Sequence, residues 1–438
     1  MKQNYQEKFE RLSPHTLLGR LDSTQQLQLR KIAFRYGFTL QELKKAANAS
    51  IDLEMWGEPK LIDCWWNWEA ESKLKGREFK KYAFTRLDQL LQEFKQQPTR
   101  YQNKPLLPLA YRRSKVEVGR SREQDKIFGM CPVQSQKTVC CNLRTIDAVK
   151  NCGFGCTYCS IQTMFTKEEV QFDVNFAEKL DQIELDQNRR YHIGTGQSSD
   201  ALMWGNSHGV LDHMFTFARK WPNALIEFKT KSKKIKYFIE KQVPFNIVCS
   251  WSVNPEQVVN NEEHLTSSLE ERLQAARKVA DRGVKVAFHL HPMIYYQGFR
   301  EDYICMIYEI TRRFSPDEVL FVSFGTLTYP KPIIEKIRSH KIQSKILQMD
   351  MVPNPEGKMT YPDHIKEQLF ELGYRAFQPW HGEVFFYLCM EEPKFWRKTF
   401  GSVYASNEDF EQDFYGKVWP KLGSDLADIS QANADRSC

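Results

Sequence analysis

Three cysteines lie close together in the run NCGFGCTYCSIQ, which spans residues 151–162. Cys152, Cys156 and Cys159 form a CxxxCxxC pattern. Soft thiolates of this kind select zinc, Cu(I) or iron–sulfur clusters. A structural zinc site needs four ligands, and a [4Fe–4S] cluster also normally takes four thiolates. Three ligands would leave one iron of a cluster open to a small molecule.

The cellular compartment decides how such cysteines are interpreted. The N-terminal run MKQNYQEKFERLSPH lacks the apolar core of a secretory signal, and no stretch approaches the roughly 18 apolar residues of a membrane span. We therefore expect a cytoplasmic protein without a membrane partner. In a reducing cytoplasm, clustered cysteines among the eleven of this chain are better explained as metal ligands or catalytic groups than as disulfides. A zinc knuckle or a chance cluster is the alternative.

From about residue 143 onward, short β-rich runs alternate with helical stretches. The six runs are LRTIDAV, YHIGTG, LIEFKTK, FNIVCSWSV, KVAFHLHPMI and EVLFVSFGT. Strands that alternate with helices predict a parallel sheet with right-handed crossovers. Six units are too few for a complete eight-stranded barrel, so the predicted fold class is α/β, a partial (β/α)6 TIM-like barrel. Ligands in such folds bind at the C-terminal ends of the strands, and the cysteine run directly follows the first strand.

The clearest predicted helix is LTSSLEERLQAARKVADRG, residues 265–283. Ser267 and Glu270 match a capping box, and Gly283 matches a helix end.

Four regions are predicted. Residues 1–95 read as a helical N-terminal domain, 96–142 as a basic extended connection, 143–340 as the partial barrel, and 341–438 as a C-terminal extension that closes it. Between Lys95 and Arg122 lie eight Lys or Arg residues and one acidic residue, Glu117. That stretch is either a solvated linker or a strip that contacts phosphates, and the formal net charge of +7 is compatible with a polyanionic partner.

The cysteine pattern at the end of the first barrel strand resembles that of the radical S-adenosylmethionine (SAM) superfamily. The resemblance implies that Cys152, Cys156 and Cys159 hold a [4Fe–4S] cluster and that the amino and carboxylate groups of SAM occupy the open iron. It also implies reductive cleavage of SAM to a 5′-deoxyadenosyl radical, which abstracts hydrogen from a substrate.

Further motifs narrow the resemblance to the spore photoproduct lyase-like family. They are TGQSSD at 195–200, EFKTKSKKI at 227–235, WSVNPEQV at 251–258, and the run from HLTSSLEERL through HLHPMIYYQGFREDY. The resemblance covers about residues 140 to 340 and does not reach the N-terminal helical region. Those enzymes reverse a UV-induced thymine dimer in DNA, so damaged or modified DNA is the implied substrate.

The family resemblance also implies roles for single residues. Ser199 and Asp200 fall where the family contacts SAM, Lys231 would pair with the SAM carboxylate, and Ser252 would complete that grip. A cation facing a carboxylate, with hydroxyls as adaptable partners, is chemically sensible. Tyr158 matches a tyrosine that relays hydrogen atoms.

Two positions depart from the lyase pattern. Gln197 stands where the lyases have a hydrogen-donating cysteine, and Ser160 stands where they have a second relay tyrosine. The adjacent pair Cys140 and Cys141 is a candidate replacement donor, or part of a second metal centre. Buried thiols are more often core packing, and that explanation stays open for each.

Other residues carry weaker signals. His289 and His291 share one face of a predicted strand, where they suit a barrel-lining contact or a satisfied place in the core. Cys131 and Cys389 are further candidate thiols.

Three functions remain open on the sequence. The first is a radical SAM enzyme acting on DNA, with a reductant such as flavodoxin or ferredoxin as partner. The second is a radical SAM enzyme acting on RNA, a peptide or a small metabolite, which the loss of the donor cysteine favours. The third is a non-catalytic iron–sulfur protein that binds nucleic acid.

Overall fold

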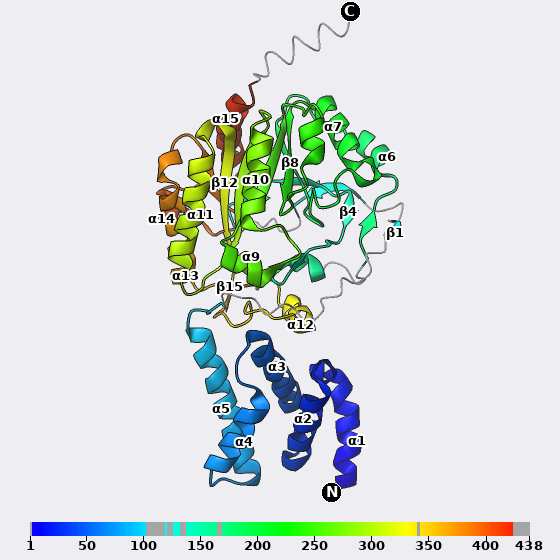
Figure 1. Ribbon diagram of the computed structural model, residues 1–438, viewed down its shortest axis with the longest axis vertical. Coiled ribbons are helices and arrows are strands. Elements are labelled where there is room, and N and C mark those ends of the chain that lie inside the picture. The colour runs from blue at the N-terminus through cyan, green and yellow to red at the C-terminus, as the bar shows by residue number, and fades with distance from the viewer. Residues whose placement is uncertain are drawn as a thin grey trace, which may run out of the picture. The chain divides into compact units, whose positions relative to one another are not determined.

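The computed structural model describes residues 2–101, 119–120, 126–131, 137–163, 169–339 and 342–423 (Figure 1). Most of the predicted basic connection, residues 96–142, lies outside the described residues. The chain divides into two compact units. Unit 1 comprises Met1–Arg112 and Pro330–Met351, and unit 2 comprises Arg113–Tyr329 and Val352–Cys438. The predicted boundaries of the four regions stay predictions.

Unit 1 is helical. Its elements are α1 (Lys2–Leu12), η1 (Ser13–His15), η2 (Leu17–Arg20), α2 (Ser23–Tyr36), α3 (Leu40–Trp56), α4 (Leu61–Glu71), α5 (Gly76–Gln96) and α12 (Pro332–Ser339). Trp56, Trp65 and Phe79 are fully buried among these helices. Burial of their aromatic surface stabilises the helical unit. Arg338 of α12 donates two hydrogen bonds, of 2.7 and 2.6 Å, to the buried carboxylate of Asp52 in α3. A segment from late in the chain thus belongs to the N-terminal helical unit.

Unit 2 is built on one curled sheet of eight strands. In spatial order they are β16 (Phe385–Leu388), β12 (Val319–Thr326), β11 (Lys285–Met293), β9 (Ile247–Ser252), β8 (Ala224–Thr230), β7 (Tyr191–Thr195), β3 (Arg144–Ile146) and β2 (Phe128–Met130). Every neighbouring pair from β16 to β3 is parallel, and β2 pairs with β3 antiparallel. The six predicted strands are all present, and the predicted partial barrel is confirmed. β16, from the predicted C-terminal extension, adds a seventh parallel strand.

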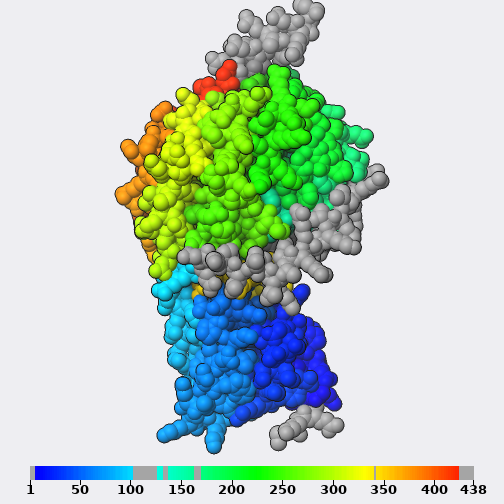
Figure 2. Space-filling view, viewed as in Figure 1, coloured from blue at the N-terminus to red at the C-terminus, as the bar shows by residue number. Residues whose placement is uncertain are grey.

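Helices of unit 2 connect and cover these strands. They are α6 (Phe176–Asp181), α7 (Val210–Lys220), α8 (Lys236–Glu240), α9 (Glu256–Glu262), α10 (Leu269–Ala280), α11 (Phe299–Arg313), α13 (Asp363–Ala376), α14 (Pro393–Phe400) and α15 (Asn407–Val418). Figure 1 shows α10 and α11 in front of the sheet, and Figure 2 shows the surface that the segments of unit 2 form, from green to orange along the chain. All residues of β9 and β12 are buried, as expected of parallel strands covered on both faces.

The start of α10 differs from the prediction by one residue. The N-cap is Ser268, which forms the capping box with Glu271 rather than Ser267 with Glu270. Both pairs satisfy the same sequence pattern, but Ser267 is engaged elsewhere. Its hydroxyl accepts a hydrogen bond from the Lys233 N–H at 2.9 Å, and its carbonyl accepts one from Nε of Arg272 at 2.9 Å.

Short strand pairs complete unit 2. β1 (Gly119–Arg120), β6 (Gln171–Phe172) and β4 (Val149–Lys150) form one small sheet, and β13 (Thr328–Tyr329), β15 (Met359–Thr360) and β14 (Val352–Pro353) form another. β5 (Gly155–Cys156) pairs with β10 (Glu263–His264). No helix in the described part of the chain is long and apolar enough to cross a membrane.

Candidate metal and cofactor site

The loop that carries the three cysteines begins with a constrained residue. Asn151, directly before Cys152, has φ of 68°, a region that few residues other than glycine adopt. Its side chain supports this conformation: Oδ1 accepts a hydrogen bond from the Cys152 N–H at 2.8 Å, and Nδ2 donates to the Glu169 carbonyl at 3.2 Å. Asparagine tolerates this region because its side chain bonds to the local backbone. The turn sets the direction in which the cysteine loop leaves β4.

Two consecutive glutamates, Glu262 and Glu263, anchor the middle of the cysteine loop. We call this pair the carboxylate clamp. In the antiparallel pair of β5 and β10, Cys156 lies opposite Glu263. The Thr157 N–H donates to the Glu262 carbonyl at 2.9 Å, and the Thr157 hydroxyl donates to the Glu262 carboxylate. The Tyr158 hydroxyl donates to the Glu263 carboxylate. The clamp therefore holds the two residues that separate the second and third cysteines.

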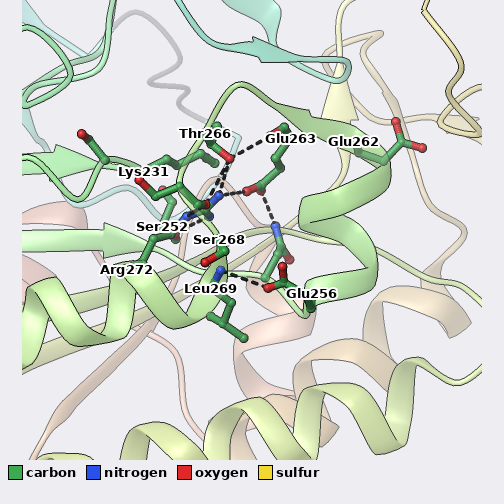
Figure 3. Close-up of polar contacts among 12 residues, drawn as sticks. Lys231, Ser252, Glu256, Glu262, Glu263, Thr266, Ser268, Leu269 and Arg272 are labelled. Carbon is green, nitrogen blue, oxygen red and sulfur yellow. Dashed lines mark hydrogen bonds and ion pairs between the residues drawn. The ribbon is translucent and has the colours of Figure 1, made fainter. Parts of the chain in front are cut away.

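A buried ion pair supports the clamp from behind (Figure 3). Nη2 of Arg272 lies 2.6 Å from Oε2 of Glu263, and both side chains are fully buried. Nη1 of Arg272 donates to the carbonyl of Ser252 at 2.9 Å, at the end of β9. Nδ2 of Asn254 donates to Oε1 of Glu263 at 2.9 Å. One guanidinium thus connects the cysteine loop, through Glu263, with the strand end that carries Ser252.

The charge state of Glu263 follows from its neighbours. Burial raises the pKa of Glu263, but Arg272 and Lys231 outweigh that effect and lower the pKa to about 2. The carboxylate is therefore ionised at neutral pH. Nζ of Lys231 lies 5.9 Å from the centre of the Tyr158 ring, a cation–π contact. Tyr158 is held at its hydroxyl by Glu263 and faces Lys231 with its ring.

The three cysteines and the four predicted SAM residues line one cavity. Its volume is about 130 Å³. The lining residues are Asn151, Cys152, Phe154, Cys156, Cys159, Ile161, Gly196, Ser199, Asp200, Lys229, Thr230, Lys231 and Ser252. These residues come from the cysteine loop and from the C-terminal ends of β7, β8 and β9. Positions up to 101 residues apart in the chain therefore meet where an α/β barrel binds ligands.

The surroundings of the thiols in this cavity disfavour the free thiolate. Burial raises the pKa of Cys152 to about 12 and that of Cys156 well above its usual range. A metal centre reverses this, because its positive charge deprotonates a coordinating thiol. Among the described residues, no three His, Cys, Asp or Glu side chains are arranged to hold a single metal ion.

A glycine at the end of β7 lets the chain turn into the cavity. Gly196 has φ of +84°, and a Cβ there would lie only 3.0 Å from the Lys229 carbonyl and the Ala201 N–H nitrogen. No larger residue fits this close backbone approach without displacement. The turn brings Ser199 and Asp200 to the wall of the cavity.

The carboxylate of Asp200 is bound mainly to the protein. Oδ1 accepts hydrogen bonds from the N–H groups of Leu202 and Met203 at 3.0 and 2.8 Å. It also accepts one from the Thr230 hydroxyl at 2.7 Å, and Oδ2 accepts one from the Lys231 N–H at 2.7 Å. Asp200 therefore ties the end of β7 to the end of β8. Its contact to SAM stays a prediction.

Cys140 and Cys141 lie in a different set of side chains. With Cys131 and Cys389 they form what we call the thiol group, whose members influence one another's pKa. The Cys141 thiol donates a hydrogen bond to Cys140, which lowers the pKa of Cys140 to about 7 and raises that of Cys141 well above its usual range. None of the four is among the described residues that line the 130 Å³ cavity. Their predicted catalytic role stays a prediction.

A buried polar network in the barrel interior was only partly visible in the sequence. Glu227 of β8 contacts Nε2 of His192 at 2.8 Å and also binds His289 and the Ser250 hydroxyl. Nδ1 of His289 in turn contacts the Ser323 hydroxyl. His289 was a candidate from its spacing, whereas Glu227 and His192 were not. The sequence did contain one signal for this network. Side chains alternate along a strand, so residues 227, 229 and 231 of the predicted strand share one face.

Comparisons with known proteins match the barrel part of the chain. The family model of spore photoproduct lyase matches residues 144–354. The spore photoproduct lyase of Clostridium acetobutylicum is 25% identical over 235 residues, 52% of this chain and 66% of that protein. That of Geobacillus sp. is 24% identical over 208 residues, 46% of this chain and 61% of that protein. The chain thus spans at most 66% of the length of these relatives.

A solved structure shares the fold. It is a spore photoproduct lyase mutant with bound AdoMet and dinucleoside spore photoproduct. The TM-score is 0.50 at 19% sequence identity, over 56% of this chain and 76% of that chain. The resemblance seen in the motifs is confirmed over the barrel part of the chain, which is similar in sequence to spore photoproduct lyases.

Proposed function

We propose that the chain is a radical SAM enzyme that acts as a repair lyase on UV-damaged or modified DNA. Cys152, Cys156 and Cys159 would hold a [4Fe–4S] cluster. The observation that carries the proposal is the single cavity that unites these cysteines with the four residues expected to bind SAM. When bound, the cluster and SAM together supply a one-electron cleavage that makes a radical able to abstract hydrogen.

The residues around the cavity suit SAM. Lys231 offers an ammonium to its carboxylate, and such a charge-assisted hydrogen bond is about twice as strong as a neutral one. Ser199 and Ser252 offer hydroxyls from the ends of β7 and β9, the two parallel strands on either side of β8. Asp200 keeps β7 and β8 in register at this point. The donors are therefore pre-positioned by backbone contacts rather than by the ligand.

Two groups remain for hydrogen transfer to and from the substrate. Tyr158 lies within the cysteine loop, where its hydroxyl is held by Glu263. Cys140 and Cys141 are adjacent thiols, and the hydrogen bond between them couples their protonation. We therefore assign Tyr158 the relay and the donation to this thiol pair.

DNA as substrate is supported by three facts of different kinds. The formal net charge is +7, which favours a polyanion. The relatives with matching sequence are spore photoproduct lyases, and one solved relative holds a dinucleoside spore photoproduct. A reductant such as flavodoxin or ferredoxin would supply the electron.

The test is anaerobic reconstitution with iron, sulfide, SAM and dithionite, followed by addition of UV-irradiated or untreated DNA. Mass spectrometry follows thymine-dimer loss and 5′-deoxyadenosine release in the same samples. The proposal predicts both products with irradiated DNA. Cys156→Ala serves as the matched control that lacks one cluster ligand. Failure of dimer loss while deoxyadenosine is released would overturn the DNA-repair part.

A second candidate function rests on Gln197. Because a glutamine stands where the lyases have their donor cysteine, the same radical chemistry would serve RNA, a peptide or a small metabolite. This second function would be favoured if deoxyadenosine release did not change on addition of irradiated DNA but rose with one of those other substrates. A protein that binds SAM but never cleaves it would instead favour the non-catalytic iron–sulfur reading.

A further inference from the structure

Lys229 occupies a position between the cofactor cavity and the buried network of the barrel. Residues 227 and 229 of β8 point to the same side of the sheet, since side chains alternate along a strand, and Lys231 directly follows the end of β8. Glu227 marks that side as the barrel interior, because it contacts His192 of β7 and His289 of β11. Lys231 marks the rim, since it faces the ring of Tyr158. Lys229 lies one step inside the barrel from Lys231.

The surroundings of Lys229 extend across the interior. It lines the 130 Å³ cavity together with the three cysteines. Burial lowers the pKa of His289 to about 4 and that of His291 well below its usual range, and the positive charge of Lys229 adds to both effects. The same charge opposes the burial that raises the pKa of Cys389. The ammonium therefore faces β11 and the thiol group as well as the cofactor cavity.

Among the residues that the structure describes, no carboxylate forms an ion pair with this ammonium. Within the described part of the chain, Nζ of Lys229 makes no hydrogen bond or ion pair. Comparable lysines are paired: buried Lys366 binds the Glu391 carboxylate, and Nζ of Lys234 donates to the Met203 carbonyl at 2.7 Å. A partly buried charge without a partner is costly, so an unpaired lysine that lines a cavity indicates a missing anionic ligand.

The cavity is lined by more ammonium groups than carboxylates. Two ammonium groups, from Lys229 and Lys231, line it beside the carboxylate of Asp200 and the three cysteine thiols, which the cluster would bind. The Asp200 carboxylate is already bound by backbone N–H groups and by the Thr230 hydroxyl. SAM brings one further carboxylate, which Lys231 at the rim would take. Lys229 then remains for a second anion that enters from the barrel interior.

We propose that Lys229 binds a phosphodiester of the substrate inside the barrel and thereby favours lesions whose two nucleosides are joined by phosphate. This inference rests on the proposed function, because it takes nucleic acid as the substrate. A lysine acts on phosphate as a point charge with three donors, so it fixes the position of the phosphate without reading the bases. The lesion would be held by its backbone while its damaged bases face the radical.

The test measures binding rather than turnover. Reconstituted protein with SAM is titrated with two probes, the spore photoproduct dinucleotide with its bridging phosphate and the dinucleoside without it. Lys229→Met is compared with wild type, with Lys229→Arg, and with Lys233→Met as the control. Lys233 follows the same strand, but its side chain is exposed and ion-paired with Glu271.

Lys229→Met should weaken dinucleotide binding by roughly 10- to 100-fold, as expected for the loss of a charged hydrogen bond. Dinucleoside and SAM binding should stay unchanged, Lys229→Arg should recover most of the loss, and Lys233→Met should behave as wild type. Equal binding of the two probes by wild type, or an equal loss for both probes, would overturn the inference. Loss of SAM binding in Lys229→Met would assign the ammonium to the cofactor instead. Wild-type protein that repairs neither probe would overturn the proposed function itself.

Discussion

Tyr158 and Glu263 are 105 residues apart in the chain and joined by a hydrogen bond from the phenol to the carboxylate, with both side chains buried. The tyrosine sits between the second and third cysteines of the loop, and the glutamate is ion-paired with Arg272. This contact makes the shape of the cysteine loop depend on a buried ion pair whose two residues do not line the cavity.

Glu263→Gln should destabilise the fold by about 3 kcal/mol, because breaking a buried ion pair leaves the other charge uncompensated. The free energy of unfolding in urea measures this. The double variant Glu263→Gln with Arg272→Met should recover most of the stability but not the SAM affinity, since Tyr158 has lost its ionised acceptor. A double variant with wild-type SAM binding would contradict the positioning role of the clamp.

The same pair should give a defined pH dependence. The pKa of Glu263 is about 2 when folded, below its ordinary value of 4.5. A group with a lowered folded pKa contributes stability above its unfolded pKa and loses it as the pH falls toward the folded value. The stability difference between wild type and Glu263→Gln should therefore be constant above about pH 5 and shrink below pH 4.5. A difference that grows on acidification would contradict this charge assignment.

Lys231→Met should separate cofactor binding from cluster binding. The ammonium lines the cavity but is not a metal ligand, so the visible absorbance of the cluster should remain. The Kd for SAM should rise by roughly 10- to 100-fold, as expected when a charged hydrogen bond is lost. Equilibrium dialysis with labelled SAM measures it. Unchanged affinity would move the carboxylate contact to another residue, and Lys229 would be the first to examine.

Cys141→Ser should uncouple radical formation from repair. Deoxyadenosine release should continue, while dimer loss falls by at least about tenfold because serine is a poor hydrogen-atom donor. Cys305→Ser, at an exposed position of α11, is the matched control. Full repair by Cys141→Ser would exclude this cysteine as the donor.

The lowered pKa of Cys140 gives an independent check on the thiol pair. Its thiolate should form as the pH rises through about 7, so alkylation of Cys140, followed by peptide mass spectrometry, should increase over that range. In Cys141→Ala the hydrogen bond that lowers this pKa is gone, and the alkylation profile should move to higher pH. An identical profile in both proteins would contradict the hydrogen bond.

The sequence predicted the barrel well because its strands are strong local signals. The runs at β8, β9 and β12 are rich in Val, Ile and Phe and are bounded by helical segments, which suffices to place parallel strands. The register of α10 was missed by one residue, since Ser267 and Ser268 each precede a glutamate by three positions. Only a tertiary contact, the Lys233 N–H on the Ser267 hydroxyl, decides between them.

The site residues that lie close together in the sequence could be predicted, whereas those that only the fold brings together could not. Cys152, Cys156 and Cys159 stand within one loop, so their spacing alone predicts a shared site. The carboxylate clamp pairs Glu262 and Glu263 with a loop more than 100 residues earlier, and two glutamates before a helix look like ordinary surface. Lys229 was equally hidden, because its role depends on which face of β8 lies inside the barrel.

We propose above all that the three cysteines of the cavity hold a cluster and that SAM is cleaved at this cluster. The most direct measurement is anaerobic reconstitution of wild type, Cys152→Ala, Cys156→Ala, Cys159→Ala and the exposed-site control Cys305→Ala, with cluster absorbance and deoxyadenosine release recorded on the same samples. The account predicts that wild type and Cys305→Ala show both signals and that each of the other three loses both. Deoxyadenosine release by any one of those three variants would contradict it.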